Sequence, residues 1–226
     1  MGNERRLAVI AIDGPAGAGK STIARSLAAR LGFTYIDTGA MYRAVALWAT
    51  RQNVKLTDMH RMEQLARAAW IELEPGGLRV LLNGNDVTEA IRAPEIAGQA
   101  SLVAAIPGVR RALVEKQRAM AATASVVMEG RDIGSVVFPA ADVKIFLDAD
   151  PEERVRRRLV EIGGAADLIA EQLTERDDRD RGRAESPLVQ APDAVYIDST
   201  GLTPVEVEEA ILKVVRAKLS NGKGFE

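Results

Sequence analysis

Residues 14–21 of this chain read Gly-Pro-Ala-Gly-Ala-Gly-Lys-Ser, which is a complete G-x-x-x-x-G-K-[ST] phosphate-binding loop. The apolar run LAVIAI at residues 7–12 precedes the loop and is typical of a short buried strand. Residues 21–31 have the apolar periodicity of a helix, and Gly32 is its expected stop signal. The motif therefore occurs in the strand–loop–helix context in which such loops bind phosphate. A glycine-rich turn that merely connects a strand to a helix is the alternative.

The residue types of the loop suit phosphate chemistry. Glycines allow consecutive backbone N–H groups to turn inward around phosphate oxygens, and the N-terminus of the following helix adds positive potential. Lys20 is predicted to reach the β- and γ-phosphates of a nucleotide, and the Ser21 hydroxyl is predicted to bind Mg²⁺. The residues expected to bind the nucleotide are Gly14, Pro15, Ala16, Gly17, Ala18, Gly19, Lys20, Ser21 and Thr22.

Length and composition set the broad class. The chain has 226 residues, enough for one sizeable domain or for one domain with an inserted lobe. A hydrophobic content of 47% and a charged content of 27% are ordinary for a soluble globular protein. The net charge of −2 provides no global positive field, so nucleic acid is not an expected partner. The absence of cysteine excludes disulfides, thiolate metal sites and cysteine nucleophiles.

The distribution of apolar residues bears on location and assembly. No apolar run approaches the length of a membrane span, and the first residues lack the apolar segment of a signal peptide. We therefore expect a cytoplasmic enzyme that has no membrane partner. No helix pattern predicts an exposed apolar face, which makes a monomer the expected state.

Strand-like and helix-like segments alternate along much of the chain. Four strands beyond the first are predicted at residues 33–36, 125–128, 143–147 and 195–197. Helices are predicted to begin at Pro151 and Pro204, because each proline follows a cap residue and precedes a glutamate at the third helical position. This order predicts an α/β fold with a parallel sheet, right-handed crossovers and helices on both faces.

The middle of the chain breaks this alternation. Residues 71–74 and 78–82 are predicted to be short antiparallel strands, because the turn-forming residues 75–77 (Pro-Gly-Gly) and 83–84 (Asn-Gly) follow them. Helices are expected next, at residues 94–106 and 109–120. We interpret this region as a lobe inserted into the core on the substrate side.

Three further segments place arginines where an open α/β sheet has its ligand crevice. Residues 37–43 (DTGAMYR) open a helix after the second strand, residues 129–132 (EGRD) close the third strand, and residues 176–183 (RDDRDRGR) end a helix. A second phosphate needs such groups, because phosphoryl transfer depends mostly on positioning and charge stabilisation. The alternative for residues 176–183 is a solvated helix end with charge pairs, and the alternative for the arginines of residues 154–158 is ordinary surface charge.

The segments IDGPAGAGKST, DTGAMYR, EGRDIGSVVFPAADVKIFLDA and ERDDRDRGRAESPL resemble the bacterial cytidylate kinases. The resemblance extends over residues 7–219 and includes the inserted strands. It implies the P-loop fold of nucleoside monophosphate kinases, with a five-stranded parallel sheet, an inserted monophosphate-binding lobe and a helical lid. It also implies a reversible transfer of the γ-phosphoryl group of ATP to CMP or dCMP, with Mg²⁺, in pyrimidine nucleotide metabolism.

The resemblance divides the chain into a core, a lobe and a lid. The core would comprise about residues 5–37, 121–150 and 190–220, the monophosphate-binding lobe about residues 38–120, and the lid about residues 151–185. The glycine pair at residues 163–164 would form the tip of that lid.

Positions that match the family's motifs acquire expected roles by the same resemblance. Thr38 and Arg43 match the positions that bind the monophosphate, and the threonine keeps the hydroxyl of the serine found in some relatives. The positions associated with cytosine recognition are Ser101, Arg110 and Asp132 in this sequence. The positions on the ribose side are Arg176 and Asp180.

A catalytic set follows from the same matching. Arg131 and Arg183 match phosphate-binding arginines, and Arg157 is expected to be an arginine of the lid. The resemblance thus implies a catalytic set of Lys20, Arg131, Arg157 and Arg183. Glu129 stands where some relatives have aspartate, and we expect this exchange to be tolerated.

Two other functions compete with this interpretation. A kinase of the same architecture could act on UMP, AMP or a small metabolite. A nucleotide-dependent switch would also carry a phosphate-binding loop, but guanine-specific switches normally contain an N-K-x-D segment, and the sequence has none.

Overall fold

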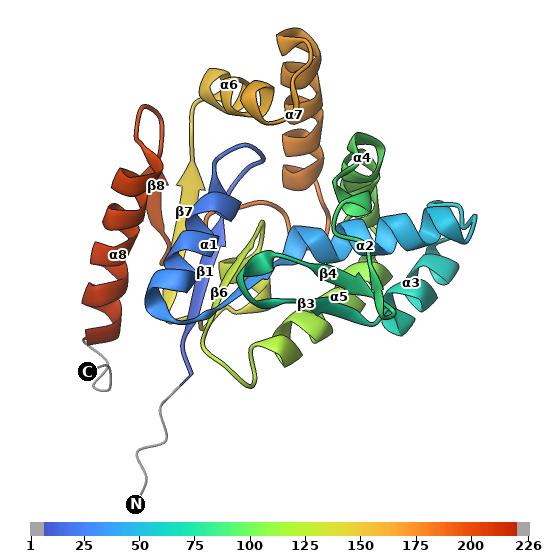
Figure 1. The fold of residues 1–226 in the computed structure, drawn as a ribbon, viewed down its shortest axis with the longest axis horizontal. Helices are drawn as coiled ribbons and strands as arrows, with labels where there is room; N and C mark the ends of the chain where they lie inside the picture. Colours follow the sequence, from blue (N-terminus) through green and yellow to red (C-terminus); the bar gives the residue numbers. More distant parts are fainter. Residues whose placement is uncertain (1–6, 221–226) are drawn as a thin grey trace, which may run out of the picture.

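The computed structural model describes residues 7–220, and its central layer is a five-stranded sheet (Figure 1). The strands lie in the order β2-β6-β1-β7-β8, and every neighbouring pair is parallel, as predicted. Their bounds are β1 Val9–Asp13, β2 Thr34–Asp37, β6 Val126–Gly130, β7 Val143–Asp148 and β8 Val195–Asp198. Each strand ends beyond its apolar run, because the sheet continues into polar or glycine residues at its carboxyl edge.

The side chains of β1 enter two different cores. Ile10 and Ile12 pack with residues of α1 (Lys20–Leu31) and α8 (Pro204–Ser220) on one face of the sheet. Ala11 belongs to a second cluster on the opposite face, which contains Met128 of β6. Burial on both faces explains why the run LAVIAI shows no polar alternation.

The flanking helices begin and end at their sequence signals, with one exception. Gly32 ends α1 in the left-handed conformation, at φ 66°. Thr203 and Glu206 form a capping box at α8, in which Thr203 N and Oγ1 both donate to Glu206 Oε2 at 2.8 Å. The expected cap at Asp150 is not made. Its side chain leaves the first turn of α6 (Pro151–Ile162) uncapped, and its backbone N–H donates to Thr200 Oγ1 at 2.8 Å.

The region between β2 and β6 forms a lobe with its own core (Figure 1). The three short strands of the lobe pair antiparallel in the order β3-β4-β5. The strands β3 and β4 confirm the two predicted strands, and β5 was not predicted. Asn83 and Gly84 both have positive φ angles, 51° and 77°, and make the predicted tight turn between β4 and β5. The elements of the lobe are α2 Thr38–Arg51, α3 Met59–Ala68, β3 Ile71–Leu73, the short helix η1 Pro75–Gly77, β4 Val80–Leu82, β5 Asn85–Asp86, η2 Ala90–Arg92, α4 Pro94–Val103 and α5 Pro107–Met120.

Two helices stand over the carboxyl edge of the sheet, at the top of Figure 1. These are α6 and α7 (Ala166–Arg181). The helical conformation is interrupted between them at the glycine pair of residues 163–164, as predicted. Ile169 and Leu173 of α7 pack against Ala16 of the phosphate-binding loop. This apolar contact places α7 directly beside the loop.

Candidate active site

The phosphate-binding loop connects β1 to α1 at the carboxyl edge of the sheet. Gly14 has a φ of 149°, and a Cβ at this position would overlap the carbonyl oxygen of Leu147, so only glycine fits. Gly17 and Gly19 also have positive φ angles. The loop thus passes close to β7 and turns its backbone toward the start of α1.

Lys20 is almost fully buried at the first position of α1. Its ammonium group donates to the carbonyl oxygen of Pro15 at 2.6 Å. Burial, followed by repulsion from Arg131, lowers the pKa of Lys20 to about 7, although the Glu129 carboxylate opposes this shift. An anion that binds at the loop would therefore stabilise the charged form of Lys20.

The carboxyl group of Glu129 connects the loop to the neighbouring strands. Ser21 Oγ donates to Glu129 Oε2 at 2.9 Å, and the hydroxyl of Tyr35 donates to Oε1. Thr38 Oγ1 donates to the Glu129 carbonyl oxygen at 2.6 Å. Burial, followed by the charge of Asp37, raises the pKa of the Glu129 carboxyl group. The sequence analysis identified Glu129 only as a replacement for aspartate. In the structure, its carboxylate orients the hydroxyl of Ser21 in the loop.

Asp13 is a buried carboxyl group that the sequence analysis did not assign. It accepts hydrogen bonds from the backbone N–H groups of Ile133 at 2.8 Å and Gly134 at 2.7 Å. These two residues begin the short π-helical turn η3 (Ile133–Val137). Asp13 therefore holds the segment that follows β6, and with it the backbone that carries Arg131 and Asp132.

Four of the predicted site residues meet around one carboxylate. Asp180 of α7 is fully buried and accepts from Arg131 Nε at 2.9 Å, from Arg183 and from Ser101 Oγ at 3.4 Å. Burial raises the pKa of Asp180, but the charges of Arg131, Arg183 and Arg176 outweigh it and hold the pKa below its ordinary value. Residues of α4, of α7 and its C-terminal end, and of the segment that follows β6 therefore meet at this carboxylate.

Arg176 lies beside this group without a neutralising partner of its own. Burial, followed by repulsion from Arg131, lowers the pKa of Arg176 to about 9. Within residues 7–220, the buried Nε atoms of Arg43, Arg176 and Arg183 have no hydrogen-bond partner. Unpartnered buried cationic donors are costly, and an anionic ligand is the natural partner for them.

The predicted cytosine-recognition residues form an adjoining group. Arg110 of α5 pairs with Asp132, and both side chains are almost fully buried. Arg110 Nη1 also donates to the carbonyl oxygen of Ala104 at 3.2 Å. Ser101 of α4 joins this group through Asp180. The structure thus brings together residues from four separate elements.

Arg157 lies on the other side of the loop. Its guanidinium donates to the Ala18 carbonyl oxygen at 3.3 Å and to the hydroxyl and carbonyl oxygens of Ser199 at 2.9 and 2.7 Å. Nη1 lies 3.6 Å from the position of a Cβ on Gly19. Arg157 therefore faces the phosphate-binding loop, and no contact joins it to the arginines around Asp180.

Arg154 and Asp177 are further residues that the sequence analysis did not assign. Arg154 Nη1 donates to Asp177 Oδ2 at 2.5 Å and to the Ala16 carbonyl oxygen at 3.1 Å, and the Ala16 N–H donates to Asp177 Oδ1 at 3.4 Å. Both side chains are buried. This pair joins α6, α7 and the phosphate-binding loop. Arg154 is therefore not an ordinary surface charge, which was the alternative for the arginines of residues 154–158.

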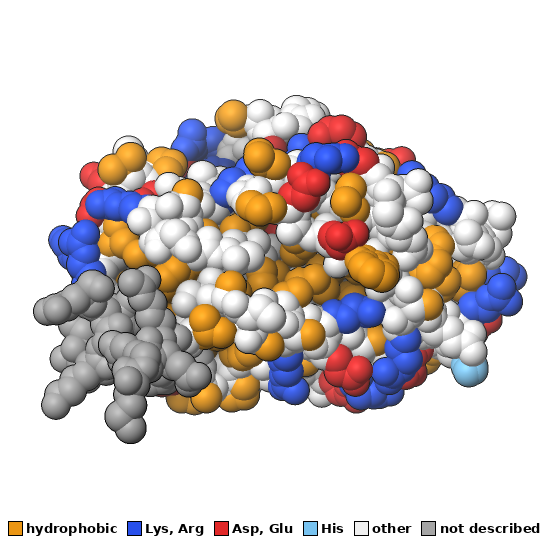
Figure 2. Space-filling model, turned by 60° about the horizontal axis from the view of Figure 1, so that its bottom comes forward, with side chains coloured by type: hydrophobic (Ala, Val, Ile, Leu, Met, Phe, Trp, Pro, Cys, Tyr) orange, Lys and Arg blue, Asp and Glu red, His pale blue; other side chains and the backbone are white. Residues whose placement is uncertain are grey.

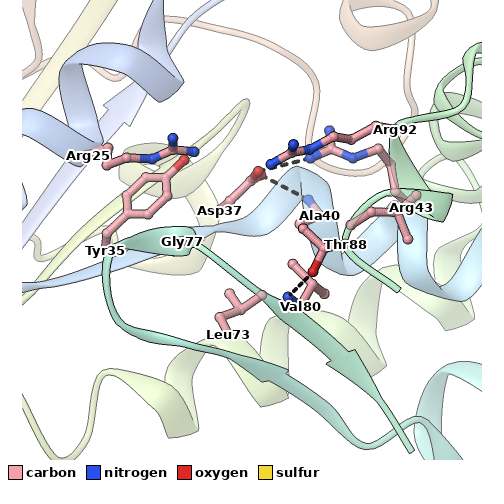
Figure 3. A pocket seen from close by; sticks show the side chains of 11 residues that line it. Arg25, Tyr35, Asp37, Ala40, Arg43, Leu73, Gly77, Val80, Thr88 and Arg92 are labelled. Carbon is pink, nitrogen blue, oxygen red and sulfur yellow. Dashed lines mark hydrogen bonds and ion pairs between the residues drawn. The ribbon is translucent and has the colours of Figure 1, made fainter. Parts of the chain in front are cut away.

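A small cavity lies where the inserted sheet meets the start of α2 (Figure 3). Arg25, Arg43 and Arg92 border it from three different elements, together with Tyr35 and Asp37. Arg43 Nη2 pairs with Asp37 Oδ2 at 2.9 Å. The cavity has a volume of about 30 Å³, which suits a water molecule and not a nucleotide. None of the predicted cytosine-recognition residues lines it.

Comparisons with known proteins agree with this geometry. The family model described as cytidylate kinase matches residues 10–217. The chain belongs to the cytidylate kinase family. A cytidylate kinase of Solibacter usitatus is 64% identical to it, covering 98% of each chain, and one of Pelotomaculum thermopropionicum is 52% identical, covering 95% of this chain and 96% of that protein. A solved structure from Thermus thermophilus has a TM-score of 0.50 at 20% identity, covers 95% of this chain and 99% of that one, and shows a similar fold.

The oxygen donors beside the loop suit a magnesium ion. Ser21 Oγ and the Glu129 carboxylate lie together beside the loop, and oxygen ligands are those that Mg²⁺ prefers. Among the described residues, no group of three histidine, aspartate or glutamate side chains could form a cage for a metal. Such a sparse set fits Mg²⁺, which usually takes one or two protein ligands and completes its shell with water and substrate phosphates.

The mixture of charges on the surface agrees with the small net charge of the chain. On the face drawn in Figure 2, Lys and Arg side chains are interspersed with Asp and Glu side chains. In the part of the chain that the structure describes, no helix combines the length and apolar character that crossing a membrane requires.

Proposed function

We propose that the residues gathered at the carboxyl edge of β1, β2 and β6 carry out the reaction of the family, the transfer of the γ-phosphoryl group of ATP to CMP or dCMP. The observation that carries this proposal is the pair of buried Nε donors of Arg176 and Arg183, which lie near Asp180 and have no hydrogen-bond partner. Arg131 and Arg176 both repel Lys20 of the phosphate-binding loop, and this proximity supports one phosphate site at the loop and a second at the arginines.

We assign the donor nucleotide to the loop. Its backbone N–H groups bind the phosphates of ATP, and Lys20 exchanges the Pro15 carbonyl for the β- and γ-phosphates. Ser21 would hold Mg²⁺, with Glu129 orienting its hydroxyl, and the bound ion would supply positive charge that offsets the charge of the phosphates. Arg157 supports the same loop from α6.

We assign the acceptor to the other side of the crevice. Thr38, Arg43, Arg131 and Arg183 bind the phosphate of CMP, whose oxygen attacks the γ-phosphorus as ADP leaves. Arg176 and Asp180 bind the ribose side. The protein supplies position and positive charge to the transferred group, and it excludes water when α6 and α7 close over the crevice.

The base pocket combines a carboxylate, a guanidinium and a hydroxyl. Cytosine offers one amino donor and two acceptors, whereas uracil replaces the amino donor by a carbonyl and the ring acceptor by an N–H. Asp132, Arg110 and Ser101 complement cytosine and leave uracil with mismatched groups. Mismatched buried polar groups cost about 1–3 kcal/mol each, so two of them predict a roughly 30-fold to several-thousand-fold preference for CMP over UMP.

We further propose that the three-part division into core, lobe at residues 38–120 and lid at residues 151–185 is functional, and that the enzyme acts as a monomer. The lobe carries Ser101 and Arg110, the lid carries Asp180, and the core carries the loop. Each substrate therefore contacts more than one part.

An assay of ADP formation with CMP, dCMP, UMP and AMP in turn tests this function. The expected result is ADP formation in proportion to the CMP or dCMP consumed, a UMP rate lower by the factor given above, and no turnover in Lys20→Ala. A nucleotide switch would instead release ADP slowly without an acceptor. The variants Arg43→Ala and Arg183→Ala should weaken CMP turnover more than ATP binding, and an equal loss in both would contradict the acceptor-side assignment.

A further inference from the structure

Tyr42 lies beside Arg110 and Asp132, two of the residues proposed to bind the base, although no role follows for it from the motif DTGAMYR that contains it. It belongs to α2, one helical turn after Thr38, and its side chain is 9% exposed. The guanidinium carbon of Arg110 lies over its ring, 5.6 Å from the centroid. This distance is within the range in which an aromatic ring attracts a cation.

The other contacts of Arg110 restrain only the edge of its guanidinium. Nη1 donates to the Ala104 carbonyl oxygen at 3.2 Å, and Nη2 pairs with Asp132. Both of these contacts are made by the Nη atoms, at the outer edge of the group. The Tyr42 ring adds a cation–π attraction, because the guanidinium carbon lies over its face, and this attraction favours some planes of the group over others.

The direction of the remaining N–H groups of Arg110 depends on that plane. Hydrogen bonds weaken steeply as they bend, so a tilted guanidinium would meet a base acceptor poorly. Tyr42 suits this role because it stays neutral: burial raises its pKa to about 12, although the charge of Arg110 opposes the shift. A neutral ring keeps its attraction for the cation over the whole working range of pH.

We propose that Tyr42 is a positioning residue which sets the plane of the Arg110 guanidinium and so contributes to the discrimination between cytosine and uracil. This proposal rests on the proposed function, in which Arg110 contacts the base. Tyr42 acts through Arg110, and its ring, not its hydroxyl, carries the effect.

The test compares Tyr42→Phe with Tyr42→Leu. Phenylalanine keeps the ring face, so the ratio of kcat/KM for CMP to that for UMP should stay within about two-fold of wild type. Leucine removes the ring, and the same ratio should fall by about ten-fold, mainly through a higher KM for CMP with the KM for ATP unchanged. Calorimetric titration with CMP alone should show the same loss of affinity without catalysis.

A matched control separates positioning from packing. Val45 lies on the same helix and is fully buried in the core of the lobe. Val45→Ala should lower the midpoint of thermal unfolding by as much as Tyr42→Leu does, yet keep the wild-type CMP:UMP ratio. A ratio that falls equally in Val45→Ala would show that loosening of the lobe is responsible, which overturns the proposal.

The double variant Tyr42→Leu/Arg110→Met distinguishes this proposal from the proposed function. If Tyr42 acts through Arg110, the double variant should have the CMP:UMP ratio of Arg110→Met alone. An independent further loss in the double variant, or a loss in Tyr42→Phe as large as that in Tyr42→Leu, would overturn the positioning role while leaving the base pocket in place. A wild-type ratio in Arg110→Met would instead overturn the base pocket, and with it the role of Tyr42.

Discussion

At the scale of single residues, Asp13 shows how a buried charge supports the site without touching a substrate. Its carboxyl group holds the N–H groups of Ile133 and Gly134, and burial raises its pKa from the ordinary 3.8 to about 6. Between these two pH values the folded protein binds more protons at this residue than the unfolded chain does. The stability that protonated Asp13 contributes is therefore complete below about pH 4 and is lost as the pH rises through about 6.

This linkage predicts a difference between wild type and Asp13→Asn. A shift of two pKa units corresponds to about 3 kcal/mol, so the contribution of Asp13 to the free energy of unfolding should fall by up to that amount between pH 4 and pH 7. Urea unfolding of both proteins at pH 4, 5, 6 and 7 measures it. The asparagine cannot titrate, so the advantage of wild type over the variant should shrink as the pH rises. Parallel pH profiles for the two proteins would contradict the prediction.

At the scale of elements, the contact between the turn η1 and β2 joins the inserted sheet to the core. Gly77 has a φ of 66°, and a Cβ there would lie 2.5 Å from Cε1 of Tyr35. Tyr35 in turn donates to Glu129, which accepts from Ser21 of the loop. The close approach of this turn therefore supports a ring whose hydroxyl belongs to the ATP side of the site.

Gly77→Ala should consequently affect both stability and the ATP side. The expected effect is a loss of more than about 2 kcal/mol in the free energy of unfolding, since the backbone strain and the overlap with the ring add together. A higher KM for ATP should accompany it. Gly76→Ala is the matched control: it has a φ of 73° but meets only Leu78 Cγ at 3.9 Å, so it should show the strain alone. Equal effects in the two variants would show that the overlap with Tyr35 does not matter.

At the scale of the whole molecule, α6 and α7 are attached to the phosphate-binding loop by a buried ion pair. Arg154 of α6 and Asp177 of α7 share Ala16 as a partner through its carbonyl oxygen and its N–H. Removal of one member of a buried pair leaves an uncompensated charge, whereas replacement of both by apolar residues is often tolerated.

A double-mutant cycle on this pair should be strongly non-additive. Arg154→Met and Asp177→Leu should each lower the free energy of unfolding by about 3–5 kcal/mol, and the double variant should recover most of that loss. Chemical denaturation measures the cycle, and the KM for ATP reports on the loop. Arg156, which is 68% exposed in its pair with Glu153, provides the control, because Arg156→Ala should change stability by less than about 1 kcal/mol. Additive losses would show that the two side chains act separately.

Much of the fold was predictable because its signals are local. The loop at residues 14–21 needs only glycines, a lysine and a serine in order, and the apolar runs of β1, β6 and β7 mark strands that are buried on both faces. Motif matching also identified Ser101, Arg110, Asp132 and Asp180, which the structure brings together. The missing cap at Asp150 shows the limit of such signals, since its side chain makes no cap bond and its backbone N–H donates to a distant residue, Thr200.

The sequence by itself therefore determined the elements of this protein, the phosphate-binding loop and the family of the site. Only the tertiary structure decided which side chains support that site. Asp13 reaches N–H groups about 120 residues away, and Ala16 meets Asp177 across 161 positions. The place of Tyr42 under Arg110 depends on the packing of α2 against α5. A buried charge or ring takes its role from whatever packs against it, and contacts between distant segments leave no periodic trace in the sequence.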